Sequence, residues 1–433
     1  MNYYSTNSRN VTASLKEAVV RSLAPDRGLY MPFEIKKMPQ SFFDGIQSLS
    51  FQEIAFEVAE SFFGEDVPED ELRREVFETL SFDCPVVRVC DNIFSLELFH
   101  GPTLAFKDVG ARFMARMLRH FTKDEDGVLN VLVATSGDTG SAVANGFLGV
   151  EGIRVFVLYP KGKVSPIQEC QFTTLGQNIT AVEVDGVFDD CQALVKNAFM
   201  DRELCSLMRL TSANSINVAR FLPQSFYYFN AYAQMKRMGF SDNLVICVPS
   251  GNFGNICSAL FAAEAGLPVK RFVAANNAND VFFNYLQTGK YVPKASVKTL
   301  ANAMDVGDPS NFARIMALYG GDWGKIKSVI SGDVISDSQI EDTMKECFAA
   351  NGYILDPHGA CGYLALMRSL REGENGIFCE TAHPAKFKDT VDRILGTDIE
   401  IPGRLAAFMK GRKQSVGISE GYNEFKNLLL NSR

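Results

Sequence analysis

The sequence predicts an α/β protein with parallel sheets, preceded by a small, mostly helical N-terminal domain. From about residue 128 onward, short apolar runs alternate with amphipathic segments. This is the pattern of βαβ units, whose parallel strands are buried on both faces. The first ninety or so residues differ, because residues 50–63 place apolar side chains at helical spacing between acidic ones. A chain of 433 residues has room for about three domains.

The expected strands and helices follow one another regularly. Apolar runs rich in Val and Ile predict the strands, and apolar side chains three or four positions apart predict the helices. Strands are expected at residues 128–134, 153–159, 179–184, 244–248, 271–275 and 376–380, and helices at residues 109–121, from near 141, and at residues 166–175, 188–200 and 256–265. We therefore expect an N-terminal domain at residues 1–92, a small α/β lobe at 93–213 and a large α/β lobe at 214–433.

The composition excludes several classes of protein. The net charge of −8 disfavours a nucleic-acid partner, and no apolar stretch approaches the roughly 18 residues of a membrane span. The start of the chain lacks the basic and apolar regions of a signal peptide. The ten cysteines are scattered, without a C-x-x-C pair or a histidine cluster beside them, so neither a disulfide framework nor a metal site is expected. A cytoplasmic protein with no membrane partner is predicted.

The segment at residues 100–108 places a lysine in an unusual position. Lys107 follows the apolar residues 104–106 and directly precedes an amphipathic helix, for which Asp108 is the expected N-cap. A helix N-terminus repels a cation, and burial also disfavours the ammonium form, so both effects lower the pKa of Lys107. Such an amine can form a Schiff base with a carbonyl group and then transfer protons. The alternative is a lysine whose ammonium group simply extends to water.

Two loops lie where a strand leads into a helix, which is where parallel α/β sheets bind their ligands. The loop at residues 249–255 contains Gly251 and Gly254, which allow the backbone N–H groups to approach a phosphate closely. The loop at residues 135–141 has four hydroxyl side chains and two glycines. An ordinary glycine turn is the alternative for the first loop. Neither loop has the spacing of a dinucleotide or P-loop nucleotide motif.

A third polar cluster, at residues 212–220, ends in Arg220 and offers amide, hydroxyl and guanidinium donors. By itself it also fits a capped helix with a solvated arginine. The three clusters together provide more anion-binding groups than one cofactor phosphate requires. We therefore expect a phosphorylated or carboxylated substrate. Four further residues are weaker candidates: His358 and His383 are expected to be structural, and Lys386 and Lys388 to be solvated or to line an anionic entrance.

A lysine suited to imine formation and a glycine loop suited to one phosphate together indicate pyridoxal phosphate. At these positions the chain resembles the threonine synthase family. The resemblance implies a fold-type II pyridoxal phosphate enzyme, in which a small mobile lobe and a larger α/β lobe enclose the cofactor. Six motifs in the same order carry it, at residues 100–108, 134–140, 212–220, 249–255, 302–311 and 381–387.

The resemblance also implies a role for each matching residue. Lys107 would be the Schiff-base lysine, Thr381 would face the pyridine nitrogen, and Asp138 would lie on the O3′ side of the cofactor. Because an ionised Asp can only accept hydrogen bonds, Asp138 is a poor direct partner for a phenolate oxygen. The cofactor phosphate would be held by Gly251, Asn252, Phe253, Gly254 and Asn255. The substrate would be bound by Ser136 and Thr139 at its carboxylate, and by Asn214, Ser215 and Arg220, with Asn252, at its phosphate.

The implied reaction converts O-phospho-L-homoserine and water into L-threonine and phosphate by γ-elimination and β-hydration, the last step of threonine biosynthesis. Lys107 would act as both base and acid, under closure of the two lobes. Two alternatives remain open: a phospho-lyase that releases 2-oxobutyrate, and a binding module without activity. A nucleotide-binding transferase is disfavoured because its phosphate motif is missing. We expect a monomer or a homodimer.

Overall fold

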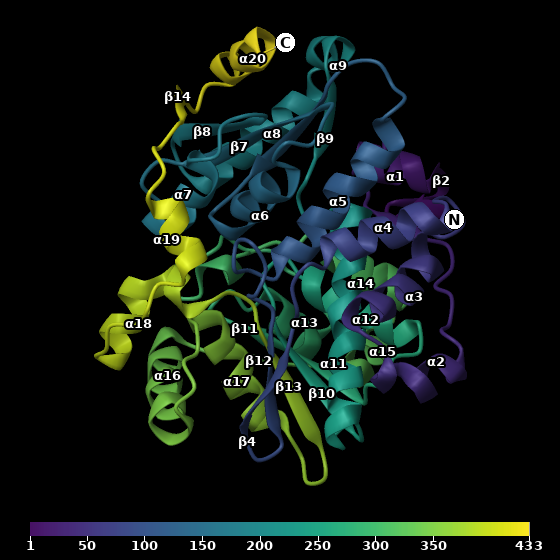
Figure 1. The fold of residues 1–433 in the computed structure, drawn as a ribbon, viewed down its shortest axis with the longest axis vertical. Coiled ribbons are helices and arrows are strands. Elements are labelled where there is room, and N and C mark those ends of the chain that lie inside the picture. The colour runs from purple at the N-terminus through teal and green to yellow at the C-terminus, as the bar shows by residue number, and fades with distance from the viewer. Residues whose placement is uncertain (433) are drawn as a thin grey trace.

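The computed structural model describes residues 1–432, which form three β-sheets surrounded by helices (Figure 1). The six-stranded sheet has the order β12-β11-β10-β13-β5-β4, the five-stranded sheet β14-β8-β7-β6-β9, and the three-stranded sheet β2-β1-β3. The two larger sheets are parallel except where β4 pairs antiparallel with β5 at one edge. The predicted α/β class with parallel sheets is confirmed.

The strands have the following bounds. The six-stranded sheet contains β4 (Val86–Cys90), β5 (Ile93–Glu97), β10 (Leu244–Pro249), β11 (Arg271–Asn276), β12 (Ile330–Val334) and β13 (Asn375–Glu380). The five-stranded sheet contains β6 (Leu129–Ala134), β7 (Ile153–Pro160), β8 (Ile179–Asp185), β9 (Arg209–Ser212) and β14 (Val416–Ser419). The three-stranded sheet contains β1 (Asn2–Ser5), β2 (Ser8–Ser14) and β3 (Tyr30–Pro32). All six strands predicted from apolar runs are present.

The helices fall into three groups along the chain. Those of the N-terminal region and the first half are α1 (Leu15–Arg21), α2 (Gln40–Gly45), α3 (Phe51–Phe63), α4 (Glu69–Thr79), α5 (Lys107–Thr122), α6 (Asp138–Phe147), α7 (Pro166–Thr173), α8 (Phe188–Met200) and α9 (Arg202–Leu207). The middle of the chain forms α10 (Val218–Phe221), α11 (Ser225–Met238), α12 (Gly254–Glu264), α13 (Val281–Thr288), α14 (Phe312–Leu318) and α15 (Trp323–Val329). The last part forms α16 (Asp337–Asn351), α17 (Pro357–Ser369), α18 (Lys388–Leu395), α19 (Gly403–Met409) and α20 (Tyr422–Asn431).

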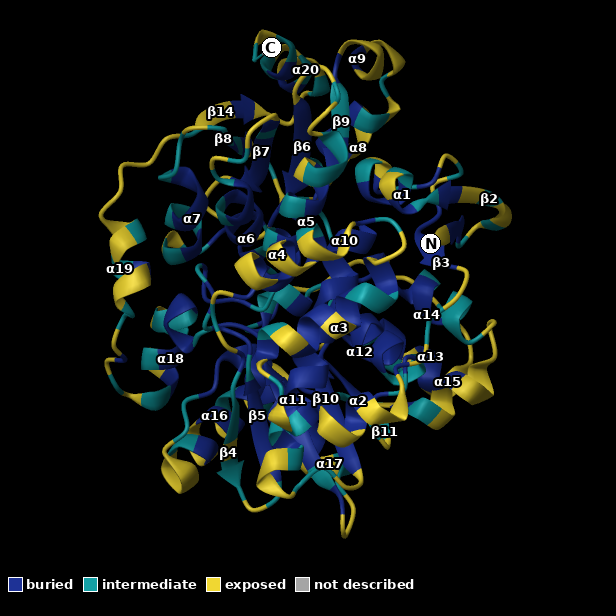
Figure 2. Ribbon diagram, turned by 45° about the vertical axis from the view of Figure 1, so that its right-hand side comes forward, coloured by how far each residue is buried: buried dark blue, intermediate teal, exposed yellow. Residues whose placement is uncertain are grey.

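The core lies between the sheets and the helices that cover them. Figure 2 shows the strands of both large sheets and the adjoining parts of α11 and α12 as buried, whereas α9, α19 and α20 carry exposed residues at the periphery. Residues of β6, β7 and β10 are buried on both faces, as expected for parallel strands with helices on each side. Each loop that leaves the carboxyl end of these strands is therefore held on a rigid base.

The N-terminal region is less purely helical than predicted. It contains helices α1 to α4, but β1, β2 and β3 form an additional antiparallel sheet. These strands are only three to seven residues long, and β2 is mostly polar and half-exposed. These strands could not be predicted from apolar runs, because they form by pairing with one another and not because of their own composition.

Two strands lie in a different sheet from the one expected from their position in the sequence. Strand β5 lies in the six-stranded sheet with β10 and β13, although residues 93–213 were assigned to the small lobe. Strand β14 pairs with β8 of the five-stranded sheet, although it follows the large-lobe residues in sequence. Figure 1 shows this C-terminal segment passing from α18 up the side of the molecule to α20. Each of the two larger sheets thus contains a strand from the residue range assigned to the other lobe.

Candidate functional site

The segment before Lys107 lies against the segment that follows β13. Phe106 donates a backbone hydrogen bond to the carbonyl of Thr381 (2.9 Å), and His383 donates one to the carbonyl of Leu104 (3.1 Å). Ala105 and Ala382 form an isolated antiparallel bridge between the same two segments. The backbone therefore brings together two residues that are 274 positions apart, Lys107 and Thr381. Thr381 is nearly buried, and its hydroxyl has no hydrogen-bond partner among residues 1–432.

Helix α5 begins two residues earlier than the sequence suggested, so the N-cap prediction for Asp108 was wrong. Lys107 is the first helical residue, and Phe106 occupies the N-cap position without a side-chain hydrogen bond. The buried Asp108 carboxylate instead accepts hydrogen bonds from the Thr103 N–H (2.9 Å) and the Thr103 hydroxyl (2.6 Å). A β-carbon on Gly101 would lie 2.4 Å from this carboxylate. Asp108 thus fixes the turn that presents Lys107.

Lys107 has the lowered pKa that its position predicted. Burial lowers the pKa to about 8; the Asp138 carboxylate opposes this shift, while the positive charges of Arg220 and Lys386 add to it. A lysine with a pKa of about 8 is partly neutral at physiological pH, so its amine can act as a nucleophile and as a base. Lys107, Asp138, Arg220 and Lys386 come from four different segments, so these four segments meet around the Lys107 amine.

Lys386 is not solvated, so the prediction that it would be solvated or line an entrance was wrong. Its side chain is fully buried in the 3₁₀ turn Pro384–Phe387, and its Nζ forms an ion pair with Asp138 Oδ1 at 2.6 Å. The same Nζ donates to the Thr103 carbonyl at 2.9 Å. Burial would raise the pKa of Asp138, but the charges of Lys386 and Lys107 outweigh it and hold the pKa at about 2. The carboxylate is therefore ionised and turned toward Lys386.

The loop after β10 has the geometry of an anion-binding site. Phe253 adopts a left-handed conformation (φ 62°) and is the N-cap of α12, which starts at Gly254, two residues earlier than predicted. A β-carbon on Gly251 would lie 2.6 Å from the Ala303 carbonyl, so only glycine fits there. No acceptor within residues 1–432 takes a hydrogen bond from the backbone N–H groups of residues 251–253. Free N–H groups at a helix start are suited to a phosphate.

Asn255 contributes to this loop in a different way from the glycines. Its side-chain amide donates to the Pro249 carbonyl at 2.9 Å, which ties the start of α12 to the end of β10. Asn252 turns the other way: its Nδ2 donates to the Ser215 hydroxyl at 2.8 Å. The loop at residues 249–255 is thereby joined to the third predicted cluster, at residues 212–220.

The third cluster contains a buried guanidinium group with an unused donor. Arg220 is 1% exposed, its Nη1 donates to the Ala213 carbonyl at 2.8 Å, and its Nε is buried without a partner among the described residues. Burial lowers its pKa to about 10. The solvated-arginine alternative is therefore wrong. Asn214, half-buried, turns its side chain toward the Ser212 hydroxyl, an interaction of 3.5 Å. A buried cation that lacks an acceptor is suited to an anionic ligand.

Two residues that support this cluster were missed by the sequence analysis. The buried Arg314 donates to the carbonyls of Ser215 (3.3 Å) and Ile216 (2.5 Å) and to the Asn311 side chain (2.6 Å). Asn311 in turn donates to the Asn252 carbonyl at 3.0 Å. Asn311 ends one of the six motifs, and Arg314 follows it by one helical turn. A charged residue at an otherwise apolar helix face was the available signal.

The loop at residues 135–141 is organised by a hydroxyl that the sequence analysis did not single out. The buried Thr135 side chain accepts hydrogen bonds from the N–H groups of Gly137 (2.9 Å) and Gly140 (2.8 Å). Helix α6 begins at Asp138, earlier than the predicted start near residue 141. Ser136 is exposed and Thr139 is half-buried, so both hydroxyls remain accessible.

The two histidines are structural. His358 is buried, pairs with Asp356 through Nδ1 (2.5 Å) and accepts from the Ala303 N–H through Nε2 (3.1 Å). His383 caps the 3₁₀ turn by accepting from the Ala385 N–H, and burial lowers its pKa to about 4. Lys388 lies near the surface and pairs with Asp392 (2.7 Å).

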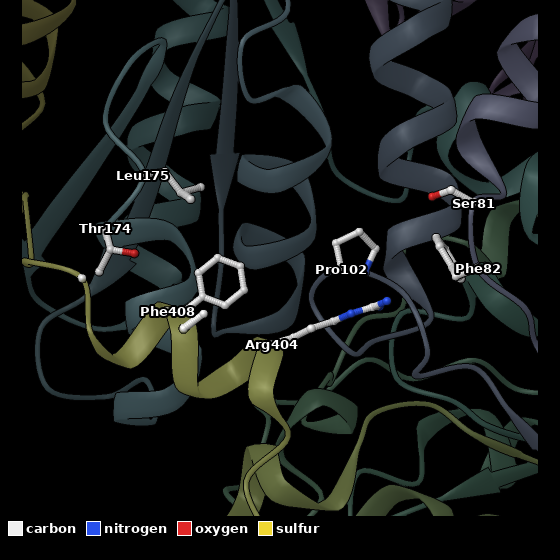
Figure 3. Close-up of a pocket in the computed structure, with 9 residues that line it drawn as sticks. Ser81, Phe82, Pro102, Thr174, Leu175, Arg404 and Phe408 are labelled. Atoms are coloured by element: carbon white, nitrogen blue, oxygen red, sulfur yellow. The ribbon is translucent and has the colours of Figure 1, made fainter.

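A separate surface cavity of about 580 Å³ lies outside this cluster, between Phe82 and Phe408 (Figure 3). Its only charged lining residue is Arg404, which points toward Pro102 in Figure 3 and donates to the His100 carbonyl at 2.8 Å. None of the predicted site residues lines it. Because it offers no base, nucleophile or unpaired anion-binding loop, we place the chemistry at Lys107.

These residues fit pyridoxal phosphate. Lys107 has a lowered pKa, and within residues 1–432 the Thr381 hydroxyl and the N–H groups of residues 251–253 have no hydrogen-bond partner. An amine, a hydroxyl and phosphate-binding donors are therefore available to this cofactor. In residues 1–432, no group of three or more His, Cys, Asp or Glu side chains could hold a metal ion. No helix in this part of the chain is both long and apolar enough to cross a membrane.

The fold and this site define a pyridoxal phosphate-dependent enzyme, and residues 88–379 match the family model described as "Pyridoxal-phosphate dependent enzyme". Residues 2–79 match the model "Threonine synthase N terminus" and residues 359–428 match "Threonine synthase, C-terminal". The chain belongs to the threonine synthase family. It is 44% identical to the threonine synthases of Serratia marcescens, over 99% of both chains, and of Escherichia coli, over 100% of both chains.

Solved structures of threonine synthases have the same fold as this chain. The crystal structure of Escherichia coli threonine synthase superposes with a TM-score of 0.93 at 41% identity, over 100% of both chains. The pyridoxal phosphate-bound threonine synthase of Brucella melitensis gives 0.93 at 32% identity, over 100% of this chain and 99% of that one. The predicted family, fold type and cofactor are thereby confirmed.

Proposed function

We propose that the protein is a threonine synthase that converts O-phospho-L-homoserine and water into L-threonine and phosphate. The observation that carries the proposal is the meeting of Lys107, whose pKa is lowered to about 8, with three separate groups of anion-binding donors. One group suits the cofactor phosphate, and two remain for a substrate with two anionic ends. O-Phospho-L-homoserine, in which phosphate is esterified to the side-chain hydroxyl of an amino acid, has a carboxylate and a phosphate.

We assign the cofactor contacts to segments that follow three strands of the six-stranded sheet, β5, β10 and β13. Bound pyridoxal phosphate supplies an electron sink that stabilises negative charge on the substrate carbon atoms. Lys107 would attach to the cofactor carbonyl carbon, and residues 251–255 would bind its phosphate at the start of α12. The Thr381 hydroxyl would hydrogen-bond the pyridine nitrogen. A hydroxyl leaves that nitrogen largely unprotonated, whereas a carboxylate would favour its protonation.

The substrate contacts are assigned to the other two loops. Ser136 and Thr139 have accessible hydroxyls at the start of α6, where the helix dipole favours a carboxylate. Arg220, with its unpartnered Nε, would bind the substrate phosphate together with Ser215, Asn214 and Asn252.

Lys107 would then transfer the protons. With its Nζ free, Lys107 would remove a proton from the substrate carbon next to it and would return one later. Phosphate would leave beside Arg220, and water would add to the β carbon. Arg220, Lys386 and burial keep the neutral amine accessible, since each lowers the Lys107 pKa.

We propose that the protein works in the cytoplasm as a monomer or homodimer, with neither a nucleic acid nor a membrane as partner. A net charge of −8 supports the first exclusion, since phosphate backbones repel an acidic protein. The two lobes, with a boundary near residue 213, would close over the substrate and exclude stray water.

A product assay tests the proposal. Purified protein with pyridoxal phosphate is given O-phospho-L-homoserine, and phosphate, threonine and 2-oxobutyrate are quantified. We expect one threonine per phosphate. Phosphate with 2-oxobutyrate instead would identify a phospho-lyase with the same cofactor chemistry. No phosphate release would contradict the substrate assignment.

A further inference from the structure

Lys386 joins three segments of the site, although it lies outside all the groups assigned to cofactor or substrate. It follows β13 and Thr381 in the six-stranded sheet. Its ammonium group pairs with Asp138, the first residue of α6 in the five-stranded sheet (2.6 Å), and donates to the carbonyl of Thr103 in the turn that presents Lys107 (2.9 Å). One side chain therefore connects the two large sheets and the lysine segment.

The environment of this ion pair indicates that it fixes the relative position of Lys386 and Asp138. The Lys386 side chain is 0% exposed and that of Asp138 4% exposed, and Gln168 donates a second hydrogen bond to the same Asp138 oxygen (2.9 Å). A buried ion pair adds little net stability, because desolvation offsets most of its attraction. It does fix the relative position of its two partners, since breaking it leaves a buried charge uncompensated.

We propose that Lys386 is a positioning residue that holds the loop at residues 135–139 and the Thr103 turn in register with Thr381. This rests on the proposed role of Ser136 and Thr139 at the substrate carboxylate. With Lys386 in place, one carboxylate oxygen of Asp138 is held by the ion pair, and the loop that carries Ser136 and Thr139 stays tied to the Thr103 turn. Without it, the loop loses its only ionic tie to the six-stranded sheet within residues 1–432.

The proposal predicts a local effect of the substitution Lys386→Met. In the apoenzyme, we expect hydrogen exchange at residues 136–141 to rise about tenfold or more, whereas exchange in β6 stays as in the wild type. In the loaded enzyme, KM for O-phospho-L-homoserine should rise by about 10- to 100-fold, with a smaller change in kcat, because a displaced loop binds the carboxylate poorly.

Two further variants separate positioning from folding. Asp138→Asn combined with Lys386→Met removes both charges, so no buried charge is left alone, and it should fold even if Lys386→Met does not. Its loop should exchange as fast as in Lys386→Met, and the two single substitutions should be non-additive in KM. Lys388→Met removes a lysine two residues away whose ion pairs lie near the surface, and it should leave exchange and KM unchanged.

Other results would overturn the proposal. Wild-type exchange at residues 136–141 with an unchanged KM in a folded Lys386→Met or double variant would show that Lys386 does not position the loop. Exchange that rises equally in β6 and the loop would show a general structural role. These readings are independent of the substrate assignment, because the exchange is measured on the apoenzyme and the wild-type product assay is scored separately.

Discussion

At the scale of the residue, the charge state of Lys107 links the structure to the chemistry. Its ammonium form is disfavoured by burial and by Arg220 and Lys386, and favoured only by Asp138. An ordinary lysine has a pKa of about 10.4, so the environment moves the neutral amine into the working range of the enzyme. The buried ion pair of Asp138 with Lys386 limits how strongly that carboxylate can oppose this effect.

The lowered pKa predicts the reactivity of the apoenzyme. Modification of Lys107 by an amine-reactive reagent should follow a pH curve with its midpoint at about 8, because the reactive neutral form predominates above the pKa. Peptide mass spectrometry across pH 6–11 measures it. Lys388 serves as the internal control, since the hydrogen bonds that its Nζ donates to Asp392 and Asp398 raise its pKa. Equal midpoints for the two lysines would contradict the electrostatic account.

The same environment affects stability with a definite sign. In the apoenzyme, the Lys107 pKa of about 8 lies below the unfolded value of about 10.4, so the unfolded chain binds more protons between these pH values. The apoenzyme should therefore gain stability relative to Lys107→Met as pH rises from 8 to 10. Urea unfolding of both proteins at each pH measures the difference. A difference that stays constant would mean that the folded pKa is not lowered.

Gly251 is a second residue for which the surroundings matter, because they leave no room for a side chain. In Gly251→Ala the new β-carbon would lie 2.6 Å from the Ala303 carbonyl, so the backbone at residues 249–255 must shift. We expect the affinity for pyridoxal phosphate to fall about tenfold or more, measured by titration of the cofactor absorbance. Gly45→Ala is the matched control, because no atom lies within 4 Å of its β-carbon. Equal affinities in the two variants would contradict the assigned phosphate loop.

At the scale of the element, helix starts determine where the functional groups lie. Helix α17 is capped by Asp356, whose carboxylate accepts from the N–H groups of His358 (2.8 Å) and Gly359 (3.3 Å) and also binds the His358 ring. His358 in turn accepts from the N–H of Ala303, the residue against which Gly251 packs. The cap of α17 is thus connected, through the His358 imidazole, to the loop at residues 249–255.

This connection predicts an effect of Asp356→Ala larger than that of an ordinary cap. The loss of an N-cap costs about 1 kcal/mol, and the buried imidazole N–H left without a partner adds about 1–3 kcal/mol. Urea unfolding should therefore give a decrease of about 2–4 kcal/mol in the free energy of unfolding. Ser336→Ala at α16 removes an exposed cap and should cost only about 1 kcal/mol. Similar losses would show that the imidazole contributes nothing.

The elements also show what the sequence could predict and what it could not. The buried strands and most helices were found because apolar periodicity is set locally. The exact start of α5 was not, because the Asp108 side chain binds Thr103, and only the folded turn brings the two together in this way. Lys386 was misjudged because its partner Asp138 is 248 positions away in sequence. Lys107 and the glycine loop at residues 249–255 could be singled out from their neighbours in sequence, whereas the ion pair between Lys386 and Asp138 required the fold.

At the scale of the whole molecule, the C-terminal segment does not pack on the sheet that is nearest to it in sequence. Strand β14 completes the edge of the five-stranded sheet, and α20 packs on α8 with Phe425 and Leu429 fully buried (Figure 1). Tyr422 donates to Asp201 at 2.8 Å, which fixes the same contact from the polar side. The last residues of the chain therefore stabilise the sheet that carries residues 135–141, and not the sheet that precedes them.

This arrangement predicts that the five-stranded sheet weakens first when the C-terminal contact is disturbed. Phe425→Ala removes a fully buried ring and should lower the free energy of unfolding by about 3–4 kcal/mol. Hydrogen exchange should rise in β8 and β14 before it rises in β10, because the loss is local to one packing unit. Phe77→Ala, which truncates an aromatic ring that is 38% exposed, should cost less than about 1 kcal/mol. Exchange that rises equally in β8 and β10 would mean that the two sheets unfold as one cooperative unit, and that the C-terminal segment stabilises the entire molecule.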